Sequence, residues 1–166
     1  MNTYFQRLQK VRQMMESNGW DALVITASDP HSSEYPAERW KQVQWVCGFT
    51  GEAGDVVITL DHAGLWTDTR YFIQAVEQLE GTGVELHKTR IPGEIRIPQW
   101  LAEYAFEGDV RHMTVAVDGL AQTVDSVENL KNAFRKAGRI EMGDGDTSFS
   151  IIDLPDMLEN VWFDRP

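Results

Sequence analysis

Arg70 is the residue of this sequence whose type and position most clearly suggest a binding role. It lies in the segment WTDTRYFIQAVEQLEG, residues 66–81, where a strand is expected to end and a helix to begin. The positive end of the helix macrodipole makes a cation mildly unfavourable in the first turn of a helix. Two explanations for the arginine remain open. Its guanidinium could pair with Asp68 and stabilise the helix start, or it could bind a ligand carboxylate through two hydrogen bonds.

A second candidate binding surface is the segment DPHSSEY, in which His31 shares a loop with Asp29, Glu34 and Tyr35. These side chains together could form a polar binding surface, although solvated loop residues give the same pattern. His31 is therefore the second candidate binding residue.

Other chemistries have weaker support in the sequence. The four histidines are dispersed and none pairs with another at the i, i+4 spacing of helical zinc sites, so no metal site is expected. His62 is interpreted as a turn residue, and His87 and His112 as residues in or beside strands. The segment GFTGEAG, residues 48–54, lacks the Lys and Ser/Thr of a phosphate-binding loop and precedes a strand, which argues against nucleotide binding. No nucleophile motif accompanies the serines or Cys47.

Composition excludes several classes of protein. The chain has 166 residues, a formal net charge of -11 and scattered basic residues, so a nucleic-acid or anionic-membrane surface is not expected. No apolar run approaches the roughly 20 residues of a membrane span. The single cysteine excludes an internal disulfide. The first residues, MNTYFQRLQKVRQMM, lack the apolar stretch of a secretory signal, which makes the cytoplasm the expected location.

The elements that must position these residues alternate between helices and strands. Apolar spacing predicts a first helix that ends at Gly19 and a buried central strand at residues 22–26, followed by a polar loop from Ala27 to Lys41. Further strands are predicted at 55–60, 64–69, 84–89, 113–118 and 139–143, and further helices at 70–80, 98–106 and 124–138. Within the helix at 70–80, the expected buried face consists of Phe72, Val76 and Leu79. The pattern indicates an α/β domain whose sheet is mixed, because residues 55–69 form a hairpin.

Three segments together resemble a known family. RLQKVRQMMESNGWDALVITASDPHSSEY, VCGFTGEAGDVVITLDHAGLWTDTRYFIQAVEQL and the closing VWFDRP are similar to the N-terminal domain of Xaa-Pro aminopeptidase, in the creatinase/prolidase superfamily. The likeness covers nearly the whole chain. In the cytosolic three-domain form, glycine commonly stands where this sequence has Thr69. The fold implied is a mixed β-sheet flanked by helices, with the ribonuclease H-like motif of creatinase N-terminal domains.

The resemblance also implies a function for the complete enzyme. Such enzymes remove an N-terminal residue that precedes proline, with two divalent metal ions, usually manganese, bound in a C-terminal pita-bread domain. This chain, residues 1–166, is too short to contain that domain, and it is expected to end at a domain boundary and to have no catalytic residue and no metal of its own. The implied partners are a peptide with proline in second position, the enzyme's C-terminal domains and a second copy in a homodimer. By the resemblance, Arg70 reaches substrate.

Two alternatives stay open at this stage. One is a noncatalytic protein-binding module of the same fold, as occurs in relatives that have lost their metal ligands. The other is the N-terminal domain of a prolidase or creatinase, although the HSSEY and TRYF segments favour the aminopeptidase.

Overall fold

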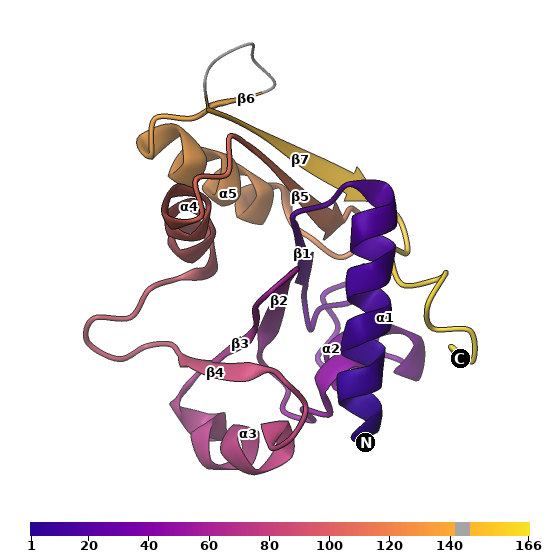
Figure 1. Ribbon diagram of the computed structural model, residues 1–166. Coiled ribbons are helices and arrows are strands. Elements are labelled where there is room, and N and C mark those ends of the chain that lie inside the picture. The colour runs from indigo at the N-terminus through magenta and orange to yellow at the C-terminus, as the bar shows by residue number, and fades with distance from the viewer. Residues whose placement is uncertain (142–146) are drawn as a thin grey trace.

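A single mixed β-sheet with helices on both faces forms the architecture (Figure 1). The computed structural model describes residues 1–141 and 147–166. Within them the sheet has seven strands in the order β4-β3-β2-β1-β5-β7-β6. The strands are β1 (Ala22–Ile25), β2 (Asp55–Thr59), β3 (Ala63–Thr67), β4 (Glu85–Lys88), β5 (His112–Asp118), β6 (Ile140–Glu141) and β7 (Ser148–Leu154).

The sheet is mixed because one strand runs against the others. β2 pairs antiparallel with both β1 and β3, while the pairs β1–β5, β3–β4, β5–β7 and β6–β7 are all parallel. The predicted hairpin is therefore confirmed, and so is the central position of β1. All four residues of β1 are buried, as expected of a strand covered on both faces.

Two hydrophobic cores lie on opposite faces of the sheet. One contains Leu23 and Ile25 of β1 and the apolar sides of α1 (Thr3–Asn18), α2 (Gln42–Cys47) and α3 (Phe72–Leu79). The other contains Ala22 and Val24 of the same strand and the apolar sides of α4 (Ile97–Glu107) and α5 (Val124–Lys136). Successive residues of a strand point to opposite faces, so β1 supplies both cores.

Local capping explains where the first helix begins and ends. Asn2 accepts a hydrogen bond from the backbone N–H of Tyr4 at 2.8 Å and so satisfies one of the free donors of α1. Gly19 follows with φ 70°, the left-handed conformation that ends many helices. The predicted end of this helix is confirmed.

The last predicted strand was only partly correct. Residues 139–143 were expected to form it, but β6 comprises Ile140–Glu141, and Met142 and Gly143 lie outside the described residues. The longer β7, with the sequence SFSIIDL, was not predicted. Three of its seven residues are serine or aspartate, which are infrequent in strands, and its pairing with β5 is a tertiary contact.

Two helical features also differ from expectation. α2 was not predicted, because six residues are too few to show a helical period. In α3 the buried residues are Ala75 and Leu79, whereas Val76 is 61% exposed and was wrongly placed on the buried face. α3 lies beside the edge strand β4, as Figure 1 shows, so only a narrow side of the helix is covered.

Candidate functional site

The candidate site lies where the parallel strands β1, β3 and β4 end. β2, which runs the other way, begins at the same edge with Asp55. Asp68 directly follows β3, and Arg90 comes two residues after β4. In α/β sheets, ligands bind preferentially outside the carboxyl ends of the strands. The topology therefore gathers charged side chains at an edge suited to binding.

Arg70 and Asp68 form a bidentate ion pair. Arg70 belongs to a short 3-10 turn, η2 (Thr69–Tyr71), that precedes α3, and not to the α-helix itself. Its Nε donates to Asp68 Oδ1 at 3.0 Å and its Nη2 donates to Asp68 Oδ2 at 2.9 Å. The backbone N–H of Arg70 also donates to Asp68 Oδ1, at 3.1 Å. Asp68 is thus both the cap of the turn and the partner of the guanidinium.

The pair is electrostatically asymmetric, because Asp68 is buried while the Arg70 side chain is 60% exposed. Hydrogen bonding from Arg70 lowers the pKa of Asp68 to about 2. The same bonds raise the pKa of Arg70, which stays charged. Two of the five N–H donors of the guanidinium are used by Asp68, and Nη1 makes no hydrogen bond to a described residue. The exposed end of the side chain can therefore bind an anionic ligand.

Asp68 lines a hollow of about 430 Å³, but Arg70 is not part of that lining. Its polar lining includes Asp55, Asp68, Arg90, Glu94 and Arg96. Burial raises the pKa of Asp55, which accepts a hydrogen bond from the backbone N–H of Ala27 at 3.2 Å. Two carboxylates in one hollow therefore have pKa values shifted in opposite directions, by burial in one case and by an arginine in the other.

His31 does not join Arg70. The side chain is exposed, and only its backbone N–H is tied down, by a 2.9 Å hydrogen bond to Asp29 Oδ1. The loop that carries His31 lines a second hollow of about 530 Å³, with residues such as Ser33, Glu34 and Tyr35, but His31 is absent from its lining. The two predicted site residues thus belong to different parts of the edge.

Sequence reasoning missed Asp55 and Arg90. Both are polar residues at a strand end, and such positions in neighbouring strands meet at one edge of the sheet. That signal was present in the sequence. To recognise that these two positions meet, the strand order was also needed, and the sequence did not supply it.

The pKa of Asp68 leads to a prediction about acid stability. Its folded-state pKa, about 2, lies below the ordinary value of 3.8, so the ionised carboxylate stabilises the fold above about pH 4. That stabilisation is lost as the pH falls from about 4 to 2. We expect Asp68→Asn to have a lower melting temperature than wild type at pH 7, and the difference to shrink toward pH 2. Thermal melts across this range measure it.

A matched control is Glu107→Gln, which alters an exposed carboxylate at the end of α4. The melting temperature of Glu107→Gln should depend on pH in the same way as that of wild type. A wild-type minus Asp68→Asn difference that stays constant from pH 7 to pH 2 would contradict the assigned pKa.

Comparison with known proteins identifies the family. Residues 7–150 match the family described as Creatinase/Prolidase N-terminal domain. The chain belongs to this family. It is 33% identical over 162 residues to a probable Xaa-Pro aminopeptidase P of Tuber melanosporum, covering 96% of this chain and 24% of that protein. It is 35% identical over 133 residues to aminopeptidase P2 of Arabidopsis thaliana, covering 79% of this chain and 18% of that protein.

Solved structures of this family show the same fold. An X-prolyl aminopeptidase of Caenorhabditis elegans, described as a cytosolic enzyme with a di-nuclear active site, matches all of this chain with a TM-score of 0.83 and 27% identity. The match covers 26% of the nematode chain. The N-terminal domain of a putative metallopeptidase from Corynebacterium diphtheriae matches 92% of this chain and 98% of its own, with a TM-score of 0.58 and 18% identity. The predicted fold class is confirmed.

The described residues, 1–141 and 147–166, do not fit a di-nuclear peptidase centre. Such a centre requires several carboxylates that bridge and bind two ions. In residues 1–141 and 147–166, one group of at least three His, Cys, Asp or Glu side chains could hold a metal, namely His62, Glu85 and His87. This group contains a single carboxylate, which is too few to bridge and bind two ions. Within the same residues, no helix has both the length and the apolar character needed to cross a membrane.

Proposed function

We propose that residues 1–166 form the N-terminal domain of a metal-dependent Xaa-Pro aminopeptidase, which removes an N-terminal residue that precedes proline. The observation that carries this proposal is the similarity to a probable Xaa-Pro aminopeptidase P over 96% of the chain. The chain spans only 18% to 24% of the two relatives described above. We therefore propose that a second domain and a catalytic pita-bread domain, with two manganese ions, complete the enzyme.

Within that enzyme, the proposed role of this domain is to form a wall of the substrate cleft. Arg70 is the proposed substrate-binding residue, supported by its 60% exposed side chain and the unused Nη1 donors. Its Asp68 partner holds it at the end of the sheet where three parallel strands stop. His31 is the second proposed binding residue, supported by its exposure in the loop beside the 530 Å³ hollow.

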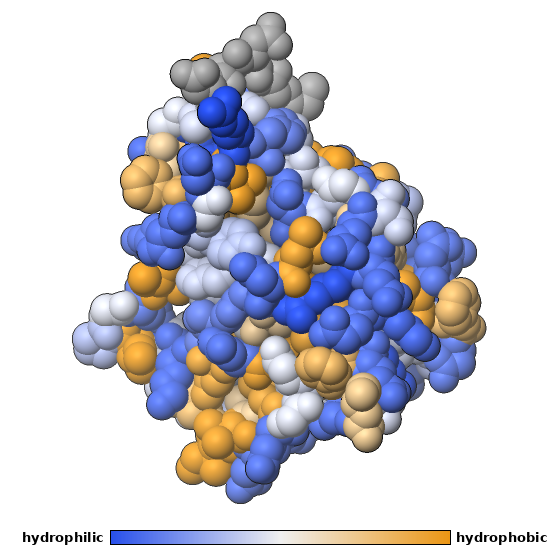
Figure 2. Space-filling model, in the orientation of Figure 1, coloured by the Kyte–Doolittle hydropathy of each residue, from blue (hydrophilic) through white to orange (hydrophobic). Residues whose placement is uncertain are grey.

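The proposed partners are the peptide, the other domains of the enzyme and a second copy in a homodimer. An apolar surface supports a role for α3 in such contacts. Ile73 and Val76 are 81% and 61% exposed, and Figure 2 shows apolar atoms gathered over α3 at the lower edge of the molecule. A cytoplasmic location is proposed because the nematode relative is described as cytosolic.

Assays on the full-length enzyme separate this function from its alternatives. Cleavage of Ala-Pro-Phe after alanine, with added Mn²⁺, is the expected result. Cleavage restricted to the dipeptide Ala-Pro would indicate a prolidase, and hydrolysis of creatine a creatinase. No turnover of any of the three, in a folded preparation loaded with metal, would favour the noncatalytic binding module.

The 166-residue chain itself is expected to show no Xaa-Pro peptidase activity. The physical reason is that its described residues offer no set of ligands for two bridging metal ions. The measurement is an assay of the purified chain on Ala-Pro-Phe with and without added Mn²⁺. Metal-dependent turnover that co-elutes with the chain through two chromatographic steps would overturn the expectation.

A further inference from the structure

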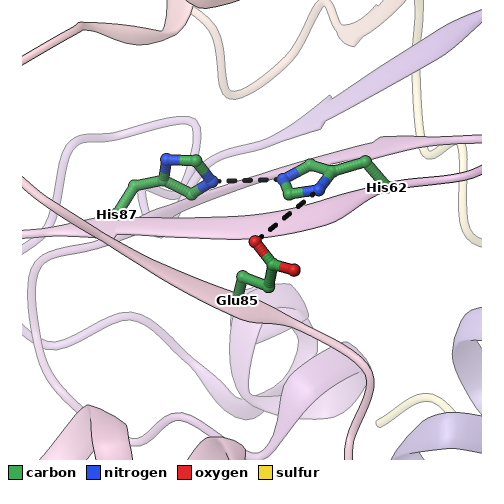
Figure 3. Close-up of side chains that lie close together, drawn as sticks. All are labelled: His62, Glu85 and His87. Atoms are coloured by element: carbon green, nitrogen blue, oxygen red, sulfur yellow. Dashed lines mark hydrogen bonds and ion pairs between the residues drawn. The ribbon is translucent and has the colours of Figure 1, made fainter.

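Two histidines that are 25 residues apart in sequence have their imidazole rings in contact (Figure 3). His62 Nε2 and His87 Nε2 lie 3.1 Å from each other. On its other side, His62 Nδ1 faces Glu85 Oε2 at 3.9 Å. One ligand atom from each of the three residues lies within 4.8 Å of the others. The spacing of the histidines along the sequence does not indicate this group, because strand pairing brings its members together.

The sheet holds this cluster in place. His62 lies in the turn between β2 and β3, and Glu85 and His87 are two residues apart on β4, so both project from one side of that strand. β4 pairs in parallel with β3, which places Trp66 opposite His87. The two rings stack with 3.8 Å between centroids and 5° between planes.

A glycine makes room for the His87 ring. A Cβ on Gly64 would lie 2.5 Å from Cδ2 of that imidazole, closer than real contacts allow. Trp100 of α4 adds an aromatic wall, with its ring centroid 4.8 Å from that of His62. His87 therefore sits in a shaped slot on the sheet, and His62 closes over it from the turn.

The surroundings of the two imidazole rings favour metal binding over an ion pair between a protonated histidine and Glu85. Burial lowers the pKa of both His62 and His87, so their nitrogens are available as lone-pair donors near neutral pH. The Glu85 carboxylate faces His62 Nδ1 in the structure, but its side chain is 73% exposed and can rotate to the Nε2 side of that ring, where His87 lies. Its negative charge would offset part of the charge of a bound cation.

We propose that His62 Nε2, His87 Nε2 and the Glu85 carboxylate bind one divalent transition metal ion, Zn²⁺. Two imidazole nitrogens bound to tetrahedral zinc at 2.0–2.1 Å are about 3.3 Å apart, close to the 3.1 Å seen here. Two histidines and a carboxylate are ligands that zinc uses, with a fourth position left for water. Imidazole nitrogens are poor ligands for Mg²⁺ and Ca²⁺, which prefer oxygen.

The bound ion would tie the β2–β3 turn to the edge strand β4. The competing interpretation of the same geometry is a hydrogen bond between two neutral imidazoles, one donating and one accepting. That interpretation predicts no saturable zinc binding. The two interpretations therefore differ in a direct measurement on the purified 166-residue chain.

The test is a calorimetric titration of the metal-free chain with Zn²⁺ at pH 7.5, together with thermal melts of the chain with and without Zn²⁺. We expect one ion per chain, and a melting temperature raised by roughly 5 to 10 °C when free Zn²⁺ is a hundredfold above its dissociation constant. Mg²⁺ and Ca²⁺ at the same concentrations should cause no such shift. His62→Ala and Glu85→Gln each remove a direct ligand, so each should weaken Zn²⁺ binding by at least about tenfold, the lower end of the range for losing an outer-shell partner.

His31→Ala is the matched control, because it removes an exposed histidine from a distant loop. It should leave Zn²⁺ affinity unchanged. The proposal would be overturned if the wild-type chain showed no saturable Zn²⁺ binding. It would also be overturned if His62→Ala bound Zn²⁺ with the affinity and melting shift of wild type. Imidazole NMR signals of the wild-type chain give an answer without any variant. The signals of His62 and His87 should shift on saturation with Zn²⁺, and a shift confined to His31 and His112 would also overturn the proposal.

Discussion

Replacing Arg70 with alanine in the full-length enzyme is expected to lower kcat/KM for Xaa-Pro peptides by roughly 10- to 150-fold. This is the range for losing a hydrogen bond to a charged group. The expectation rests on the proposed substrate role of the exposed guanidinium, whose Nη1 makes no hydrogen bond to a described residue. Arg70→Lys should recover only part of the loss, because an ammonium group cannot form the bidentate fork. Steady-state kinetics on Ala-Pro-Phe provide the measurement.

The ion pair with Asp68 requires a control for structural effects. The helix macrodipole by itself would make Arg70→Ala neutral or slightly stabilising, since the substitution removes a cation from a helix start. The structure reverses that expectation, because the variant leaves the buried Asp68 carboxylate without its partner. We now expect a lower melting temperature as well. Activity and stability must therefore be measured on the same preparations.

Substrate chemistry separates the two roles of Arg70. If the guanidinium binds the peptide carboxylate, a C-terminally amidated peptide should be a poorer substrate for wild type but an equal one for Arg70→Ala. If Arg70 serves only Asp68, the variant should lose stability and keep its kcat/KM. Intact activity in a destabilised Arg70→Ala enzyme would reject the substrate role.

Phe149→Ala is expected to lower the free energy of unfolding of the 166-residue chain by about 3 to 5 kcal/mol. Phe149 of β7 is fully buried and stacks on Phe134 of α5, with 5.1 Å between ring centroids. Its removal leaves a cavity between the sheet and α5 that rigid neighbours cannot fill. Domains of this size are typically stable by about 5 to 15 kcal/mol, so the variant should be marginal at 37 °C. Urea denaturation gives the value.

Phe163→Ala provides the comparison, because that ring is 85% exposed near the C-terminus. Its effect should stay within about 0.5 kcal/mol of wild type. Equal and small effects of the two substitutions would mean that β7 does not contribute to the core.

Strong local patterns in the sequence were sufficient to predict most of the elements. The apolar spacing of Phe5, Leu8, Val11 and Met15, followed by Gly19, predicted α1 and its end, both of which the structure confirms. The continuous apolar run at residues 22–26 predicted a strand buried on both faces, and the observed β1 (Ala22–Ile25) is buried throughout. These features depend on residues that are close together in the sequence, so no tertiary contact is needed to specify them.

Elements with weak local patterns were decided by tertiary contacts. α2 is six residues long, and β7 owes its place to pairing with β5 over the full length of both strands. Val76 has the spacing of a buried residue, yet it is exposed because α3 lies at the edge of the sheet. Periodicity identifies an apolar side of a helix but cannot say how much of that side a neighbour covers.

The same division applies to the candidate sites. From sequence, Arg70 could be recognised as an unusual cation at a helix start, and pairing with Asp68 could be named as one of two explanations. Only the structure showed that the pair forms and leaves one end of the guanidinium exposed. The His62–His87 contact could not be predicted at all, because it depends on the parallel pairing of β3 and β4. Strand order is a property of the whole chain, since each pairing competes with every other strand for its edge.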